Sequence, residues 1–207
     1  MRLLAEGLSA RRGEDLIFKD ISFDLAGGEA LVVTGPNGSG KSTLLRVLAG
    51  LLGADSGRVR LKGGPAGFDH PRELSHYLGH RNAMKRELTV EENLIFWQRF
   101  LGDSPGGSGD GLVEAATAVG LADIIHLPFG YLSAGQQRRM AMAKLLVAYR
   151  PIWLLDEPTA ALDVSADRLF AGLVARHLER GGIVIAATHQ ALGFTGVKSL
   201  EMTGFFH

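Results

Sequence analysis

The stretch that decides the fold of this chain reads Gly35-Pro36-Asn37-Gly38-Ser39-Gly40-Lys41-Ser42-Thr43. It satisfies the pattern G-x-x-x-x-G-K-S/T, in which glycines allow consecutive backbone N–H groups to curl around a phosphate without a Cβ in the way. A continuous apolar run over 30–33 precedes it, and the run over 44–49 has the composition of a helix start. These flanks argue against a Gly-rich turn that matches by chance. The nine residues, called the phosphate loop below, are therefore predicted to bind the phosphates of a nucleotide.

Two side chains of the phosphate loop have predicted roles in phosphoryl chemistry. Lys41 is expected to reach the β- and γ-phosphates, and the hydroxyl of Ser42 is expected to ligate Mg²⁺. The loop opens directly into a helix, whose N-terminus adds partial positive charge. ATP and Mg²⁺ are therefore the predicted ligands.

Two carboxylates follow a second apolar run, in Trp153-Leu154-Leu155-Asp156-Glu157-Pro158. The ends of parallel strands are where an α/β sheet places its ligands. Asp156 is predicted to orient Mg²⁺ through water, and Glu157 is predicted to be the general base for the attacking water. By itself this pattern more often marks a strand that ends at a solvated acidic turn. Together with the phosphate loop, the catalytic interpretation is favoured.

The apolar patterning predicts two kinds of sheet. The runs over 30–33, 152–155 and 183–187 are continuous, which is typical of parallel strands buried on both faces. The segments 21–25 and 58–62 alternate instead, which predicts antiparallel strands with one wet face. The chain therefore begins β-rich and ends with alternating strands and helices.

The middle of the chain is predicted to be helical. Capping-box patterns at Thr89 with Glu92 and at Ser133 with Gln136 mark two helix starts, and a further helix is expected from about 112 to 119. The Gly-rich segment 102–111 is predicted to be a mobile loop.

Composition excludes several classes of protein. The chain has 22 basic and 22 acidic residues among its 207, so a nucleic-acid partner is not expected. It has no cysteine, which excludes disulfides, thiolate metal sites and cysteine nucleophiles. Neither a signal peptide nor an apolar stretch of bilayer length is visible. Any work at a membrane is expected to be done from the water side through a partner.

The segment Leu132-Ser133-Ala134-Gly135-Gln136-Gln137-Arg138-Arg139 resembles the LSGGQ signature of ATP-binding-cassette (ABC) proteins. The resemblance covers essentially the whole chain. It implies an α/β fold, a P-loop NTPase of the ABC ATPase type with a mixed sheet core and an antiparallel β subdomain. It further implies one domain over 1–207, with a helical subdomain inserted at about 82–150. The signature residues Ser133, Ala134, Gly135 and Gln136 would contact the nucleotide of a second copy, in a head-to-tail dimer.

Two further motifs carry the same resemblance. Ala160-Ala161-Leu162-Asp163 looks like the D-loop, which implies that Asp163 crosses the dimer interface. Thr188-His189 follows a buried strand and looks like the switch histidine. The resemblance implies that His189 contacts the γ-phosphate and holds the water and Glu157 in place.

Two motifs depart from the family pattern. The family has an aromatic residue near the end of the first strand to stack on adenine, whereas this chain has Ala10-Arg11-Arg12-Gly13. Arg12 either stacks its guanidinium plane on the base or belongs to a solvated basic turn. His80 stands where the family has the glutamine of the Q-loop. It either binds the metal or its water as neutral imidazole, or has a hydrogen-bonding role, which is favoured.

A narrower resemblance rests on Tyr77-Leu78-Gly79-His80, Lys85, Leu88-Thr89, Glu92-Asn93-Leu94 and Phe96-Trp97. These residues look like those of the ATPase subunits of haem exporters in cytochrome c maturation. The resemblance implies an ATPase that is peripheral on the cytoplasmic side of the bacterial inner membrane, paired with a membrane-spanning subunit. Whether its step moves haem or releases a haem-loaded chaperone stays open.

Two other functions remain as alternatives. The first is the ATPase of another small ABC transporter with a different substrate, which a copurifying membrane partner would distinguish. The second, from another class, is a soluble ABC ATPase that acts on nucleic acid or ribosomes. The balanced charge argues against that second alternative.

Overall fold

The structure is a computed structural model of the 207-residue chain, and it describes residues 1–65, 68, 70–102, 109–159, 162–188 and 197–204. The chain divides into two compact units. The first comprises Met1–Gly79, Pro151–Pro158 and Val174–His207, and the second comprises His80–Arg150 and Thr159–Leu173.

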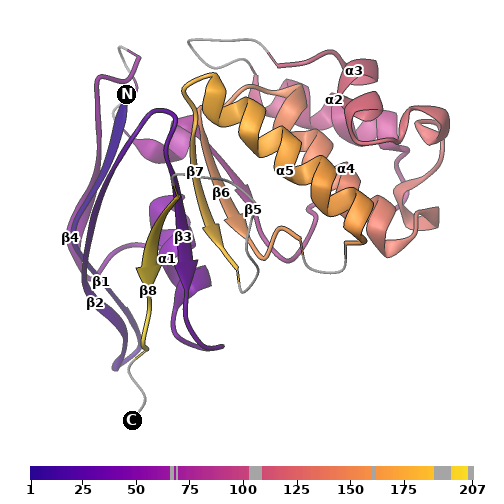
Figure 1. The fold of residues 1–207 in the computed structure, drawn as a ribbon. Helices are drawn as coiled ribbons and strands as arrows, with labels where there is room; N and C mark the ends of the chain where they lie inside the picture. The colour runs from indigo at the N-terminus through magenta and orange to yellow at the C-terminus, as the bar shows by residue number, and fades with distance from the viewer. Residues whose placement is uncertain (66–67, 69, 103–108, 160–161, 189–196, 205–207) are drawn as a thin grey trace. The chain divides into compact units, whose positions relative to one another are not determined.

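The first unit contains two sheets (Figure 1). One is five-stranded, in the order β5-β6-β7-β3-β8, and every pair of neighbours in it is parallel. The other is three-stranded and antiparallel, in the order β2-β1-β4. Both kinds of sheet predicted from the patterning are therefore present. The strands are β1 (Arg2–Arg12), β2 (Asp15–Ala26), β3 (Ala30–Thr34), β4 (Ser56–Lys62), β5 (Ser75–Leu78), β6 (Ile152–Asp156), β7 (Ile183–Ala187) and β8 (Val197–Glu201).

The three continuous apolar runs are confirmed as β3, β6 and β7, and the two alternating segments are confirmed within β2 and β4. Every residue of β6 and of β7 is buried, as expected for strands in the interior of a parallel sheet. Strand β8, which the sequence patterning did not predict, pairs with β3 at the edge of this sheet.

The core of the first unit lies around helix α1 (Lys41–Leu48). One buried cluster joins the apolar face of α1 to side chains of both sheets, so burial against two sheets fixes this helix. Its most buried members include Leu44, Leu45 and Leu48 of α1, Leu3, Leu8 and Leu25 of the antiparallel sheet, and Val33, Leu154 and Ile185 of the parallel sheet.

The named elements that lie wholly in the second unit are helical. The long ones are α2 (Val90–Leu101), α3 (Leu112–Ala118) and α4 (Ala134–Val147), and α5 (Val164–Glu179) begins here and ends in the first unit. A helical subdomain over about 82–150 stays a prediction. Of the loop predicted over 102–111, residues 103–108 lie outside the described residues. None of the helices in the described part of the chain is long and apolar enough to cross a membrane.

Both predicted capping boxes are confirmed. The hydroxyl of Thr89 accepts from the backbone N–H of Glu92 at 3.1 Å, and the Glu92 carboxylate accepts from the Thr89 N–H at 2.8 Å. Ser133 and Gln136 make the same reciprocal pair at the start of α4, at 3.3 and 2.8 Å. These bonds satisfy backbone donors that the first turn of a helix leaves unpaired.

A buried histidine lies in the last turn of α5, in the first unit. The ring of His177 stacks on Trp153 of β6, with centroids 3.9 Å apart and planes 13° apart, and it is 5% exposed. Its Nε2 lies 3.2 Å from the carbonyl oxygen of Pro151. Burial lowers the pKa of His177 to about 4, so the ring is neutral in the folded protein near neutral pH.

This lowered pKa predicts an acid-sensitive stability. The unfolded chain binds the His177 proton below about pH 6.5, whereas the folded chain binds it only near pH 4. The free energy of unfolding should therefore fall between these values, by about 2 kcal/mol from about pH 7.5 to pH 5. His177→Phe keeps a ring on Trp153 and cannot titrate, so its urea midpoint should depend less on pH over the same range. Equal pH dependence in the two proteins would contradict this assignment.

Candidate nucleotide-binding site

The phosphate loop connects β3 to α1, and its glycines adopt conformations that other residues rarely reach. Gly35, Gly38 and Gly40 have φ values of 136°, 83° and 97°. A Cβ on Gly35 would come within 2.1 Å of the Met202 carbonyl oxygen, and one on Gly40 would come within 2.7 Å of Cγ2 of Ile17. A Cβ on Gly38 would meet no atom within 4 Å. The loop is thus held closely at both ends, while the backbone at its middle is accessible to a ligand.

The start of α1 has hydrogen-bonding capacity that suits a phosphate. Its N-cap is Gly40, so no side chain caps the first turn. The Ser39 hydroxyl is buried and has no hydrogen-bond partner among the described residues. Leaving such a group unpaired costs about 1–3 kcal/mol, and a phosphate oxygen would relieve that cost. This unpaired hydroxyl is the observation by which the loop fits the triphosphate of a nucleotide.

The side chain of Lys41 folds back onto the loop residues that precede α1. Its ammonium donates to the carbonyl oxygens of Gly35 at 2.6 Å and of Pro36 at 3.1 Å, and the residue is 8% exposed. The two bonds hold a positive charge beside the loop's own backbone. A cation in this position can neutralise the charge of bound phosphates.

The two predicted metal ligands lie side by side. Ser42 Oγ donates to Asp156 Oδ1 at 2.9 Å, which joins α1 to the end of β6 across 114 positions of sequence. A hydroxyl and a carboxylate are oxygen ligands of the kind that Mg²⁺ prefers, so this pair fits the metal that accompanies ATP. The second oxygen, Asp156 Oδ2, accepts from the phenol of Tyr77 at 3.3 Å. Burial raises the pKa of Tyr77, which keeps this donor protonated.

Glu157 leaves β6 in the left-handed region, with φ 47°. This conformation costs a residue with a Cβ about 1–2 kcal/mol, and a backbone hydrogen bond from Glu157 N to the Ala187 oxygen, at 2.8 Å, holds it. Strain of this kind concentrates at functional sites. That Glu157 is the general base stays a prediction.

His189, the predicted switch histidine, lies outside the described residues. Thr188, immediately before it, is fully buried and donates to the Val33 oxygen at 3.3 Å. Since Val33 is two residues before the phosphate loop, Thr188 lies at the same sheet edge as that loop. The roles predicted for His189 are not tested by this geometry.

The residues predicted to act across a dimer are in the second unit. Ser133 and Ala134 are exposed at the start of α4, and a Cβ on Gly135 would meet no atom within 4 Å. Asp163 accepts from the N–H of Ala166 at 2.8 Å, at the start of α5. Of the predicted D-loop, Ala160 and Ala161 lie outside the described residues.

The residues of the two irregular motifs are both exposed. Arg12 is the last residue of β1, paired in register with Asp15, and His80 follows β5 after one glycine. Neither interpretation of Arg12 and neither interpretation of His80 is decided by these positions.

Three contacts of the site were not predicted from the sequence: Tyr77 on Asp156, Met202 against Gly35, and Ile17 against Gly40. In the sequence, Tyr77 belongs to the pattern that carries the narrower resemblance, and that pattern gives its side chain no role. No local sequence pattern predicts such contacts, because each one depends on which strands become neighbours in the sheets.

The fold and the phosphate loop define a P-loop nucleotide-binding protein. Residues 18–160 match the ABC transporter family. The chain therefore belongs to the ABC transporter family, as an ATP-binding ATPase of that family. A protein from Pyrococcus furiosus described as an ABC transporter (ATP-binding protein) shares the fold, with a TM-score of 0.80 and 23% identity over 98% of each chain.

Two relatives narrow the family. The chain is 87% identical, over all of both chains, to the cytochrome c biogenesis ATP-binding export protein CcmA of Rhizobium meliloti. It is 65% identical to the protein of the same name from Agrobacterium fabrum, over 99% of this chain and 97% of the relative. The narrower resemblance drawn from the sequence is confirmed.

The unpaired Ser39 hydroxyl predicts opposite effects on binding and stability. Ser39→Ala removes no hydrogen bond between described residues, so the urea midpoint should stay the same or rise slightly. ATP affinity measured by calorimetry should fall about tenfold, because a hydrogen bond to a charged phosphate is lost. Ser199→Ala, on the exposed side of β8, is the matched control and should change neither quantity. A large loss of stability in Ser39→Ala would show that the hydroxyl serves the fold instead.

Proposed function

We propose that this chain is the ATP-hydrolysing subunit of a bacterial ABC exporter that delivers haem for the maturation of c-type cytochromes. One observation carries the proposal: full-length identity of 87% to an export protein of cytochrome c biogenesis, in a chain whose phosphate loop and Ser42–Asp156 pair fit Mg²⁺ and ATP. The subunit works on the cytoplasmic side of the inner membrane and is bound there through a membrane-spanning partner.

The chemistry assigned to the site is in-line hydrolysis of ATP. Ser39 and Lys41 bind the phosphates, and Ser42 with Asp156 would hold Mg²⁺, which would supply positive charge beside the transferred group. Glu157 accepts a proton from the attacking water while the oxygen of that water forms a bond to the γ-phosphorus. The bond from that phosphorus to the departing ADP oxygen breaks, which yields ADP and phosphate. His189 would hold the water in line with that bond.

A second copy of the chain completes each site in this proposal. The first turn of α4 has a helix dipole and backbone donors that favour an anion, and Ser133 and Ala134 are exposed there. In a head-to-tail dimer this turn contacts the γ-phosphate bound by the other copy. Closure on ATP and opening after hydrolysis then supply the mechanical step.

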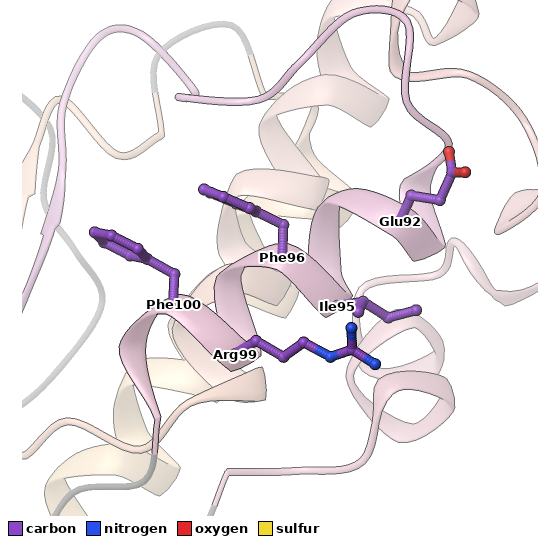
Figure 2. Close-up of a pocket in the computed structure, with 5 residues that line it drawn as sticks. All are labelled: Glu92, Ile95, Phe96, Arg99 and Phe100. Carbon is purple, nitrogen blue, oxygen red and sulfur yellow. The ribbon is translucent and has the colours of Figure 1, made fainter.

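The surface of α2 supports a membrane-spanning partner. A hollow along this helix is lined by Glu92, Ile95, Phe96, Arg99 and Phe100 (Figure 2). Phe96 is 41% exposed and Phe100 is 67% exposed, and their rings stack with centroids 5.7 Å apart. Exposed aromatic surface with a charged rim is typical of a protein–protein contact. We assign it to an apolar cytoplasmic segment of the membrane subunit.

Contacts on the inner side hold this aromatic surface in place. Trp97 packs edge-on against both Phe96 and Phe100, and its indole N–H donates to the Ala83 oxygen at 3.1 Å. The ammonium of Lys144 on α4 lies 4.5 Å from the Trp97 ring centre. Such a cation–π contact is stronger where the cation is shielded from water, and Lys144 is buried. The docking surface is therefore ordered before any partner binds.

Removing the proposed base should separate binding from turnover. Glu157→Gln should bind ATP with near-normal affinity and lose at least a hundredfold in turnover, because the amide cannot accept the proton. ATP should then trap a dimer that gel filtration detects. Hydrolysis at a near-normal rate would remove Glu157 as the base.

The cellular role predicts a cytochrome phenotype. A strain that lacks the gene should have no haem-stained c-type cytochromes. The wild-type gene should restore them, and Glu157→Gln should not. If the deleted strain makes normal c-type cytochromes while the purified protein hydrolyses ATP, the chain instead serves another small ABC transporter.

The docking surface predicts a defect in assembly alone. Phe100→Ser should lower the affinity for the membrane subunit by about thirtyfold or more, as expected for loss of a buried aromatic anchor, and so reduce copurification. ATP affinity of the isolated chain should not change. Val113→Ser, at a comparably exposed position of α3, is the matched control. Equal recovery of partner with both variants would place the contact elsewhere.

A further inference from the structure

The Asp156 carboxylate is held on both of its oxygens. Ser42 donates to Oδ1 at 2.9 Å, and Tyr77 donates to Oδ2 at 3.3 Å. Ser42 belongs to the phosphate loop and already has a predicted role at the metal. Tyr77 has none, although its phenol lies on the same carboxylate.

The register of the parallel sheet directs Tyr77 to this carboxylate. Strand β5 lies at the edge of the sheet beside β6, and Tyr77 is paired with Leu154. Side chains two residues apart on a strand point to the same face, so Leu154 and Asp156 share a face with Tyr77. The neighbours of Tyr77 in β5, His76 and Leu78, point to the other face and are buried. The tyrosine therefore reaches along β6 toward its last residue.

Gly79 leaves the space that the phenol occupies. A Cβ on Gly79 would lie 3.0 Å from Cε1 of Tyr77 and 3.2 Å from its hydroxyl oxygen. These distances are tighter than ordinary van der Waals contact, so an alanine there would require the ring to shift by a few tenths of an ångström. The absence of a side chain at 79 and the register of β5 thus favour one position of the phenol.

We propose that Tyr77 is a positioning residue of the Mg²⁺ site: its hydroxyl fixes the plane of the Asp156 carboxylate so that Oδ1 faces Ser42, and this pair would hold the metal. The assignment rests on the proposed function, in which Mg²⁺ enters with ATP. Groups that orient a metal-binding carboxylate change metal affinity by about 10- to 100-fold. At 3.3 Å the Tyr77 bond is long, so an effect of about tenfold is expected. It should be confined to the metal, because Tyr77 does not belong to the phosphate loop.

The test separates the metal from the nucleotide. The affinity for a non-hydrolysable ATP analogue is measured by calorimetry with excess Mg²⁺ and again with EDTA. The ratio of the affinity in Mg²⁺ to the affinity in EDTA reports the coupling between nucleotide and metal. Tyr77→Phe keeps the ring and removes only the hydroxyl. The ratio should fall about tenfold, while affinity in EDTA stays within about twofold of the wild type. Gly79→Ala, which shifts the phenol by a few tenths of an ångström and so lengthens a bond that is already 3.3 Å, should lower the ratio in the same direction.

Tyr131→Phe, which removes an exposed phenol in the second unit, is the matched control and should leave the ratio unchanged. An unchanged ratio in Tyr77→Phe overturns the assignment while the proposed function stands. An equal loss with and without Mg²⁺ also overturns it, since Tyr77 would then support the fold. Failure of the wild-type chain to bind the analogue at all would instead reject the proposed function.

Discussion

The hydrogen bond between Ser42 and Asp156 joins the two halves of the site. It links the first turn of α1 to the carboxyl end of β6, segments that are 114 positions apart. Because the Asp156 residue is almost completely buried, the carboxylate must be paired within the protein or with a bound cation. The hydroxyl and the phenol that pair with it come from α1 and β5. The site therefore exists only when α1, β5 and β6 are correctly placed relative to one another.

The position of α1 in this arrangement depends on its apolar packing. The helix is only 8 residues long and would not be stable in isolation, so its position comes from burial of Leu44, Leu45 and Leu48 against two sheets. Residues 35–40 of the phosphate loop lie between β3 and this helix, and residues 41–43 form the first turn of the helix. The geometry of the loop is therefore a consequence of packing that takes place away from the nucleotide, and the glycines make that geometry attainable.

Two unfavourable features lie where the ligand would bind. Ser39 has a buried hydroxyl with no partner among the described residues, and Glu157 has a left-handed backbone. The first unit has such features elsewhere too: the buried indole N–H of Trp153 has no partner among the described residues, and Asp20 has a φ of 56°. At Ser39 and Glu157 the position in the fold adds to the cost, because both lie beside the Ser42–Asp156 pair or the phosphate loop, where a ligand could supply the missing interactions.

The sequence by itself determined the phosphate loop, the three buried strands and both capping boxes, because glycine spacing, continuous apolar runs and cap residues act over a few neighbouring positions. It also indicated the Ser42–Asp156 pair, through the requirement that both reach one metal. Only the tertiary structure decided the strand order β5-β6-β7-β3-β8. That order puts Tyr77 on Asp156 and Met202 against Gly35. Which distant strands become neighbours is settled by the packing of the whole core, and no local pattern encodes it.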